Sequence, residues 1–133
     1  LSADLLHVLA SMGHGDEIAL VDANFPATTT AKRLVNLPGV DATRVLDAVL
    51  SVLPLDDFVP DAACTMQVVG DASAVPPAVQ DFAATLVRHF EKPPASLERF
   101  AFYARAAQAF AVVATGDTRL YGNILLKKGV VRS

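Results

Sequence analysis

The segment MGHGDEIALVDANFPA (residues 12–27) contains the change from helix to buried strand that decides the fold class. Within it, residues 17–23 (EIALVDA) are a short apolar run with a charged start, which is typical of a strand buried in a sheet. Gly13 marks the end of the preceding element, and Phe25-Pro26 interrupts the strand pattern. The segment therefore predicts a helix end, a sharp turn and a buried strand in close succession.

Amphipathic helices are predicted before this strand and at three later places in the chain. They are expected over residues 2–12, 41–53, 77–90 and 99–108. Ser2 and Asp41 are suitable N-caps for the first two helices, because each side chain can accept a backbone hydrogen bond from the first turn. Pro54 prevents the second helix from continuing. Each helix carries an apolar stripe, which is expected to pack against a sheet.

Further short apolar runs predict the remaining strands. They are expected over residues 33–36, 63–69, 109–115 and 123–127. Because helices alternate with short apolar strands, the order predicts an α/β fold with a mostly parallel sheet and helices on both faces. The sequence contains no internal repeat and no linker, so residues 1–133 are predicted to form a single domain.

Composition excludes several classes of protein. Lys and Arg total 11 and Asp and Glu total 14, so the formal net charge is −3. A mildly acidic chain is poorly suited to binding nucleic acid, which depends on clustered cations. No apolar run approaches the roughly 20 residues of a membrane-spanning helix. We therefore expect neither a nucleic-acid partner nor a membrane one.

The apolar content and the cysteine content suggest an assembly and a compartment. Hydrophobic residues make up 53% of the chain and charged residues 19%. This apolar surplus is large for a small monomer and suggests burial against other subunits, as in a homo-oligomer. Cys64 is the single cysteine, which excludes an internal disulfide, and no signal peptide is visible at the N-terminus. A reducing cytoplasm is the expected compartment.

His14 is the first candidate for chemistry. It lies between Gly13 and Gly15 at the junction of a helix and a buried strand, where glycines allow a sharp turn and the close approach of a ligand. An imidazole exchanges protons near neutral pH, and Asp16 is close enough in sequence to orient it. The segment alone fits equally well a histidine that only fills space in a loop.

Other candidate positions follow strands or lie near the C-terminus. Asp22 ends the first long strand, where a carboxylate can accept hydrogen bonds from ligand hydroxyls or cap the following turn. The sequence Tyr121-Gly122-Asn123 can form a corner that recognises hydroxyl groups, but it also fits an ordinary turn. Periodicity by itself makes Arg105 a solvent-exposed arginine. None of these positions identifies a reaction without further information.

No motif for a metal or a cofactor is present. The three histidines do not pair at helical spacing, and His-Glu-x-x-His is absent. The glycine-rich patterns of nucleotide-binding loops are absent too. Cys64 has no histidine or basic neighbour in sequence, so it is predicted to be a buried and unreactive thiol. We therefore expect no metal site and no cofactor.

Two stretches resemble the cytoplasmic sugar mutarotases that comprise D-ribose pyranase and L-fucose mutarotase. They are residues 12–27, quoted above, and residues 99–130 (RFAFYARAAQAFAVVATGDTRLYGNILLKKGV). The combination of GHGDE, DANFP and YGN is similar to the fucose branch, whereas ribose-type members tend towards GHTDE, DAGLP and YAN. One departure is Asn24, where fucose-type members commonly have histidine. At this position the sugar contacts implied by the resemblance would differ from those of fucose-type members.

The resemblance implies a cofactor-independent isomerase with a ribose pyranase-like fold. Its activity would be the interconversion of α and β anomers of a reducing pyranose, L-fucose above all. His14 corresponds to the proton donor of the family. Its sugar-binding positions correspond to Asp22, Arg105, Tyr121 and Asn123. The resemblance leaves open whether Tyr121 or Asp16 takes part in proton transfer.

The resemblance also implies a ring-shaped homodecamer with active sites at subunit boundaries, completed by the C-terminal segment of a neighbour. Two alternatives to a fucose mutarotase are kept. One is the same reaction with D-ribose or another aldose as the substrate. The other is a protein that binds a monosaccharide without turnover, as an accessory of an uptake system.

Overall fold

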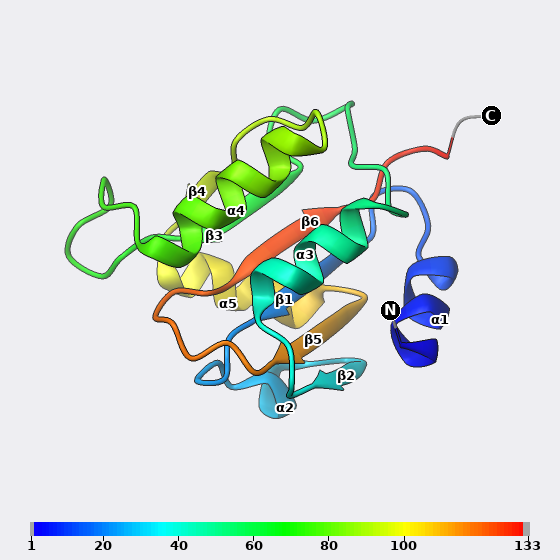
Figure 1. The fold of residues 1–133 in the computed structure, drawn as a ribbon, viewed down its shortest axis with the longest axis horizontal. Coiled ribbons are helices and arrows are strands. Elements are labelled where there is room, and N and C mark those ends of the chain that lie inside the picture. The colour runs from blue at the N-terminus through cyan, green and yellow to red at the C-terminus, as the bar shows by residue number, and fades with distance from the viewer. Residues whose placement is uncertain (1, 132–133) are drawn as a thin grey trace.

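The central element of the computed structural model, which describes residues 2–131, is one mixed six-stranded sheet with the order β2-β5-β1-β6-β3-β4 (Figure 1). The strands are β1 Glu17–Val21, β2 Leu34–Leu37, β3 Ala63–Met66, β4 Ala95–Leu97, β5 Ala111–Thr115 and β6 Ile124–Lys127. Parallel pairs join β1 to β5, β2 to β5 and β3 to β4, whereas β6 is antiparallel to both β1 and β3. The predicted mostly parallel sheet is confirmed.

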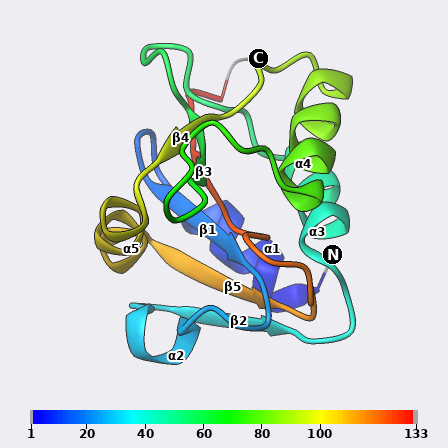
Figure 2. The same ribbon diagram turned by 90° about the vertical axis from the view of Figure 1, so that its left-hand side faces the viewer.

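Helices cover both faces of this sheet, as predicted. They are α1 Ala3–Ser11, α2 Ala27–Thr30, α3 Ala42–Leu50, α4 Pro77–Arg88 and α5 Arg99–Gln108. Figure 2 shows α3 and α4 on one side of the sheet and α2 and α5 on the other. One apolar core joins α1, α3 and α4 to Ile18, Leu20 and Val113, and a second joins α2 and α5 to Val21 and Val112. None of the helices within residues 2–131 has the length and apolar character needed to cross a membrane.

Local sequence signals explain most element boundaries. Ser2 Oγ accepts a hydrogen bond from Leu5 N at 3.1 Å, and Asp41 Oδ1 accepts one from Arg44 N at 2.8 Å, so both predicted N-caps are confirmed. The strand predicted over residues 63–69 ends earlier, because a tight turn follows it in which Gly70 has a φ of +83°. Several helices are likewise a few residues shorter than predicted.

The antiparallel direction of β6 brings distant segments to the two ends of β1. Its first residue, Ile124, pairs with Leu20, so the segment just before β6 lies beside the end of β1. Its last residue, Lys127, pairs with Glu17, so the segment after β6 lies beside the turn before β1. The two candidate regions of the sequence, around His14 and around Asp22, therefore occupy opposite ends of one central strand.

Gly116, directly after β5, allows the close approach of another chain segment. A Cβ atom at this position would lie 2.0 Å from the carbonyl oxygen of Pro38. We expect Gly116→Ala to lower the free energy of unfolding by about 2–3 kcal/mol, because the backbone would have to shift. Gly39→Ala is the matched control, since a Cβ there meets no atom within 4 Å. Equal urea unfolding midpoints for the two variants would contradict this expectation.

Candidate functional site

A cavity of about 240 Å³ lies where β1 ends. Its lining combines polar and apolar side chains: Asp22, Asn24, Phe25, Met66, Val69, Arg99, Tyr103, Leu120, Tyr121 and Asn123. The polar members come from the segment after β1, from α5 and from the residues before β6. Three residues singled out in the sequence, Asp22, Tyr121 and Asn123, are thus brought together around one cavity.

Asp22 is the buried acidic group of this cavity, with only 5% of the residue exposed. Its Oδ1 accepts a hydrogen bond from Asn24 N, and its Oδ2 accepts one from Gly122 N, both at 3.0 Å. The backbone N–H of Asp22 donates to Asn123 Oδ1 at 2.9 Å. Burial raises the pKa of the Asp22 carboxyl, and the backbone hydrogen bonds offset part of this effect. Each carboxylate oxygen retains capacity to accept another hydrogen bond.

The Tyr121–Gly122 corner is a special backbone arrangement. Tyr121 has a φ of 60°, which few residues with a Cβ adopt, and its hydroxyl oxygen accepts a hydrogen bond from Val69 N at 3.1 Å. A Cβ at position 122 would lie 3.2 Å from Asp22 Cβ and 3.3 Å from the carbonyl oxygen of Arg119. Glycine therefore lets the backbone come close enough to hydrogen-bond the Asp22 carboxylate.

Arg99 lines the same cavity, and the sequence analysis did not single it out. It is the first residue of α5, and its guanidinium carbon lies 4.6 Å from the centre of the Phe100 ring. Its Nε is buried and has no hydrogen-bond partner within residues 2–131. A buried donor without a partner is costly. The only sequence signal for Arg99 is its place at the start of the RFAFY stretch.

Arg105 lies away from this cavity. Its Nε and Nη2 donate to the carboxylate of Glu17 at the start of β1, and its Nη1 lies 3.6 Å from Cys64 Sγ. The reason is geometric: six residues separate Arg99 from Arg105 along α5, which carries Arg105 about 9 Å further along the helix. The sugar contact of Arg105 stays a prediction. In this chain its guanidinium is paired with Glu17 and lies outside the cavity, which does not favour such a contact.

His14 lies at the other end of β1, with 47% of its side chain exposed. Its Nε2 is 3.2 Å from Oδ1 of Asp56, whose side chain is only 4% exposed. The carboxylate of Asp16 instead accepts a hydrogen bond from Gly13 N at 2.8 Å. In this chain Asp56, rather than Asp16, is therefore the carboxylate that orients His14.

Asp56 is itself held in place. Its Oδ1 accepts a hydrogen bond from Phe58 N at 3.0 Å, and the Phe58 ring centre lies 5.3 Å from that of His14. The hydrogen bond from Phe58 N, followed by that from His14, keeps the pKa of the Asp56 carboxyl below its ordinary value. The carboxylate is thus ionised at neutral pH, which suits a partner that fixes an imidazole.

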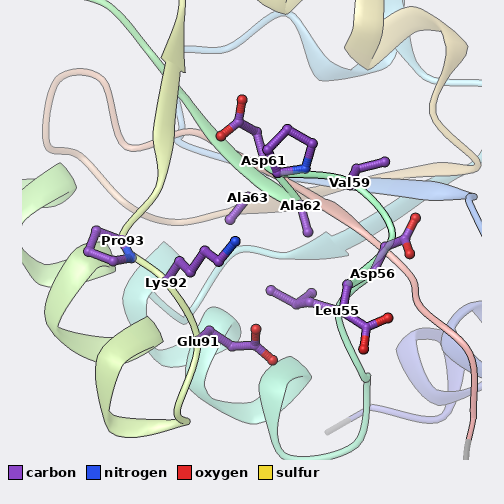
Figure 3. A pocket seen from close by; sticks show the side chains of 11 residues that line it. Leu55, Asp56, Val59, Asp61, Ala62, Ala63, Glu91, Lys92 and Pro93 are labelled. Carbon is purple, nitrogen blue, oxygen red and sulfur yellow. The ribbon is translucent and has the colours of Figure 1, made fainter.

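A smaller hollow adjoins Asp56, and Figure 3 shows it between the segment containing Asp61 and the segment containing Glu91 and Lys92. Its volume of about 90 Å³ corresponds to a few water molecules and is too small for a monosaccharide. Burial raises the pKa of Glu91, and the charge of Asp57 adds to this effect. Residues 2–131 contain no group of three or more His, Cys, Asp or Glu side chains placed to hold a metal ion.

One chain does not bring His14 to the cavity around Asp22. Strand β1 separates the two groups, and its five residues span about 13 Å between the first and last Cα atoms. Exposed apolar side chains lie beside both groups: Phe58 is 67% exposed next to His14, and Leu120 is 69% exposed at the cavity. Proton transfer by His14 to a ligand beside Asp22 would therefore need a second copy of the chain.

Fold and cavity together define a small α/β protein with a buried carboxylate, a guanidinium, an amide and a phenol around one pocket, a set suited to a polyhydroxylated ligand. The chain belongs to the family described as the RbsD / FucU transport protein family, whose model matches residues 1–131. The resemblance stated from the sequence is confirmed.

Named relatives are similar over almost the whole chain. Fucose mutarotase from Homo sapiens is 44% identical, with 98% of this chain and 90% of that protein covered. L-fucose mutarotase from Histophilus somni (strain 2336) is 41% identical, with 98% and 92% covered. The crystal structure of the fucose mutarotase from Streptococcus pneumoniae in complex with L-fucose has a TM-score of 0.93 and 41% identity, and covers 98% of this chain and 94% of that one. The structure of Bacillus subtilis RbsD complexed with D-ribose (TM-score 0.76, 22% identity, covering 99% and 95%) shares the fold.

Proposed function

We propose that the protein is an L-fucose mutarotase, an isomerase that interconverts the α and β anomers of the free sugar. The observation that carries the proposal is the cavity in which the Asp22 carboxylate lies together with the Arg99 side chain and the Tyr121–Gly122 corner. Relatives at 41–44% identity are named fucose mutarotases, and a solved one was crystallised with L-fucose. Both facts support the same substrate.

Each polar group of the cavity has a role in binding. Asp22 accepts hydrogen bonds from sugar hydroxyls through the capacity that its two backbone contacts leave open. The guanidinium of Arg99 donates to a sugar oxygen, and Asn123 and Tyr121 add further contacts. Apolar side chains complete the lining and suit the C–H face and the methyl group of a 6-deoxy sugar: Phe25, Met66, Val69 and Leu120. This arrangement fixes the sugar before reaction.

The reaction needs only proton transfers. His14, oriented by Asp56, delivers a proton to the ring oxygen while the anomeric hydroxyl gives one to water, and the bond between C1 and the ring oxygen breaks to give the open-chain aldehyde. Rotation about the C1–C2 bond turns the other face of the carbonyl towards the former ring oxygen. Closure by the reverse proton transfers then gives the other anomer, with no net change in protons or electrons.

The site is proposed to form between subunits of a homodecamer. The separation of His14 from Asp22 along β1, together with the exposed apolar side chains that flank both groups, supports a site shared between subunits. We also place the protein in the cytoplasm. The support for this compartment is that Cys64, the single cysteine, is a buried free thiol whose pKa is raised by burial.

NMR exchange spectroscopy on equilibrated sugars tests the activity. We expect the protein at catalytic concentration to accelerate anomer exchange of L-fucose, with smaller acceleration for galactose, rhamnose and ribose. Greatest acceleration with ribose would move the substrate to the ribose type. Saturable fucose binding with exchange no faster than in buffer would instead indicate a binding accessory and would refute the mutarotase proposal.

A further inference from the structure

The guanidinium of Arg119 joins the loop of residues 116–123, which forms one side of the cavity, to two helices. Its Nη1 donates to Asp81 Oδ2 on α4 at 2.6 Å, and its Nη2 donates to Thr43 Oγ1 on α3 at 2.7 Å. Its Nε and Nη2 also donate to the carboxylate of Asp117 in the same loop, at 3.1 and 2.8 Å. One side chain thus fixes the loop against both α3 and α4.

Asp117 transmits this attachment to the residue that follows Asp22. The Asp117 side chain is 2% exposed, its Oδ2 accepts a hydrogen bond from Ala42 N at 3.0 Å, and its carbonyl oxygen accepts one from Ala23 N at 2.7 Å. Burial favours the neutral carboxyl, but the hydrogen bonds from Arg119 and Ala42 outweigh it and lower the pKa of Asp117. A buried negative charge is therefore kept beside the cavity by Arg119.

The loop needs such an attachment because of its backbone. Tyr121 adopts a left-handed φ of 60°, which is unfavourable for a residue with a Cβ. Gly122 fits between two carboxylate side chains: a Cβ there would be 3.2 Å from Asp22 Cβ and 3.5 Å from Asp117 Cγ. A small displacement of the loop would therefore move the Tyr121 hydroxyl and the Gly122 N–H relative to the Asp22 carboxylate.

The charges of Asp117 and Arg119 also act on Asp22. The titratable or charged side chains around Asp22 are those of Arg99, Tyr103, Asp117 and Tyr121. The lining also contains Met66 and Val69, which do not titrate. The charge of Asp117 adds to the effect of burial in raising the pKa of Asp22. Arg119 offsets that charge, because its guanidinium is paired with the Asp117 carboxylate.

We propose that Arg119 is a positioning residue for sugar binding, which fixes residues 121–123 against Asp22 and offsets the charge of Asp117 beside that carboxylate. Arg119 itself is absent from the lining of the cavity, so its effect passes through the loop and through Asp117. The expected effect of Arg119 on KM rests on the proposed function. Its expected effect on the titration of Asp22 does not depend on turnover.

Two substitutions separate the two roles. Arg119→Gln removes both the charge and the hydrogen bonds that the guanidinium donates to Thr43, Asp81 and Asp117. We therefore expect KM for L-fucose to rise about 10-fold, with kcat changed less than about 3-fold. We also expect Asp22 to titrate at a pH about 0.5 higher. Arg119→Lys keeps a charge near Asp117 but cannot bridge Thr43, Asp81 and Asp117 together. It should raise KM while leaving the Asp22 titration close to that of the wild type.

The Asp22 titration is measured by ¹³C NMR of carboxyl-labelled aspartate, with the resonance assigned through Asp22→Asn. Arg88→Gln is the control, since Arg88 is 63% exposed and pairs with Asp47 away from the cavity; it should change neither quantity.

A folded Arg119→Gln with wild-type KM and an unmoved Asp22 titration overturns the proposal, even if its melting temperature falls. If that variant does not fold, an unchanged KM in Arg119→Lys overturns it. If wild-type protein fails to accelerate exchange, the proposed function fails, and the Asp22 titration still decides the role of Arg119.

Discussion

His14→Ala is expected to lower the rate of fucose anomer exchange by about 10³-fold at saturating sugar, because the variant loses the group that delivers the proton to the ring oxygen. Fucose affinity should change little, since the binding groups lie around Asp22 at the other end of β1. The measurement is NMR exchange at a fixed sugar concentration, together with fucose titration by calorimetry. His7→Ala is the control, because His7 lies on an exposed part of α1 and belongs to neither group.

The same variant tests where the active site forms. Asp22→Asn should also be nearly inactive, because it removes the carboxylate that binds the sugar. If His14 of one subunit acts on a sugar held by Asp22 of another, mixed oligomers of the two inactive variants should regain about a quarter of wild-type activity. Undiminished anomer exchange in His14→Ala would refute the assignment of His14 as the proton donor. Failure of refolded mixtures to regain activity would contradict a site shared between subunits.

Much of the fold could be predicted because its elements carry local signals. The helices that begin at Ala3 and Ala42 follow residues whose side chains cap them, and β1 and β5 are short, mostly apolar runs. The short elements α2 and β4 could not be predicted: four and three residues are too few to show periodicity. Strand β4 exists through its pairing with β3, which no local pattern reveals.

The candidate site shows the same division between local and long-range causes. Asp22 was recognisable because it directly follows a buried strand, and Asn123 because it is an amide beside the glycine of the Tyr121-Gly122-Asn123 corner. That they meet depends on β6 being antiparallel to β1, which the strand pattern does not specify. Asp56 was missed because 42 residues separate it from His14. It reaches His14 through a backbone hydrogen bond from Asp56 N to Lys127 O at 3.0 Å, at the end of β6.

A comparison of two arginines on α5 tests the predicted sugar contact of Arg105. Arg99→Gln is expected to lower kcat/KM for L-fucose by about 10²-fold, because hydrogen bonds to a charged donor typically contribute about 1.5–3 kcal/mol. Arg105→Gln should leave kcat/KM within about 3-fold of the wild type. It should instead lower the free energy of unfolding by about 1–2 kcal/mol, since it leaves the half-buried Glu17 carboxylate without its partner.

Anomer-exchange kinetics and urea unfolding on the same protein samples separate these outcomes. Arg44→Gln is the control for removal of a surface arginine, because Arg44 is exposed on α3, away from both groups. The expected pattern follows from position alone: Arg99 begins α5 at the cavity, whereas Arg105 faces the start of β1. Loss of fucose binding in Arg105→Gln, with Arg99→Gln still active, would show that Arg105 of a neighbouring subunit supplies the guanidinium.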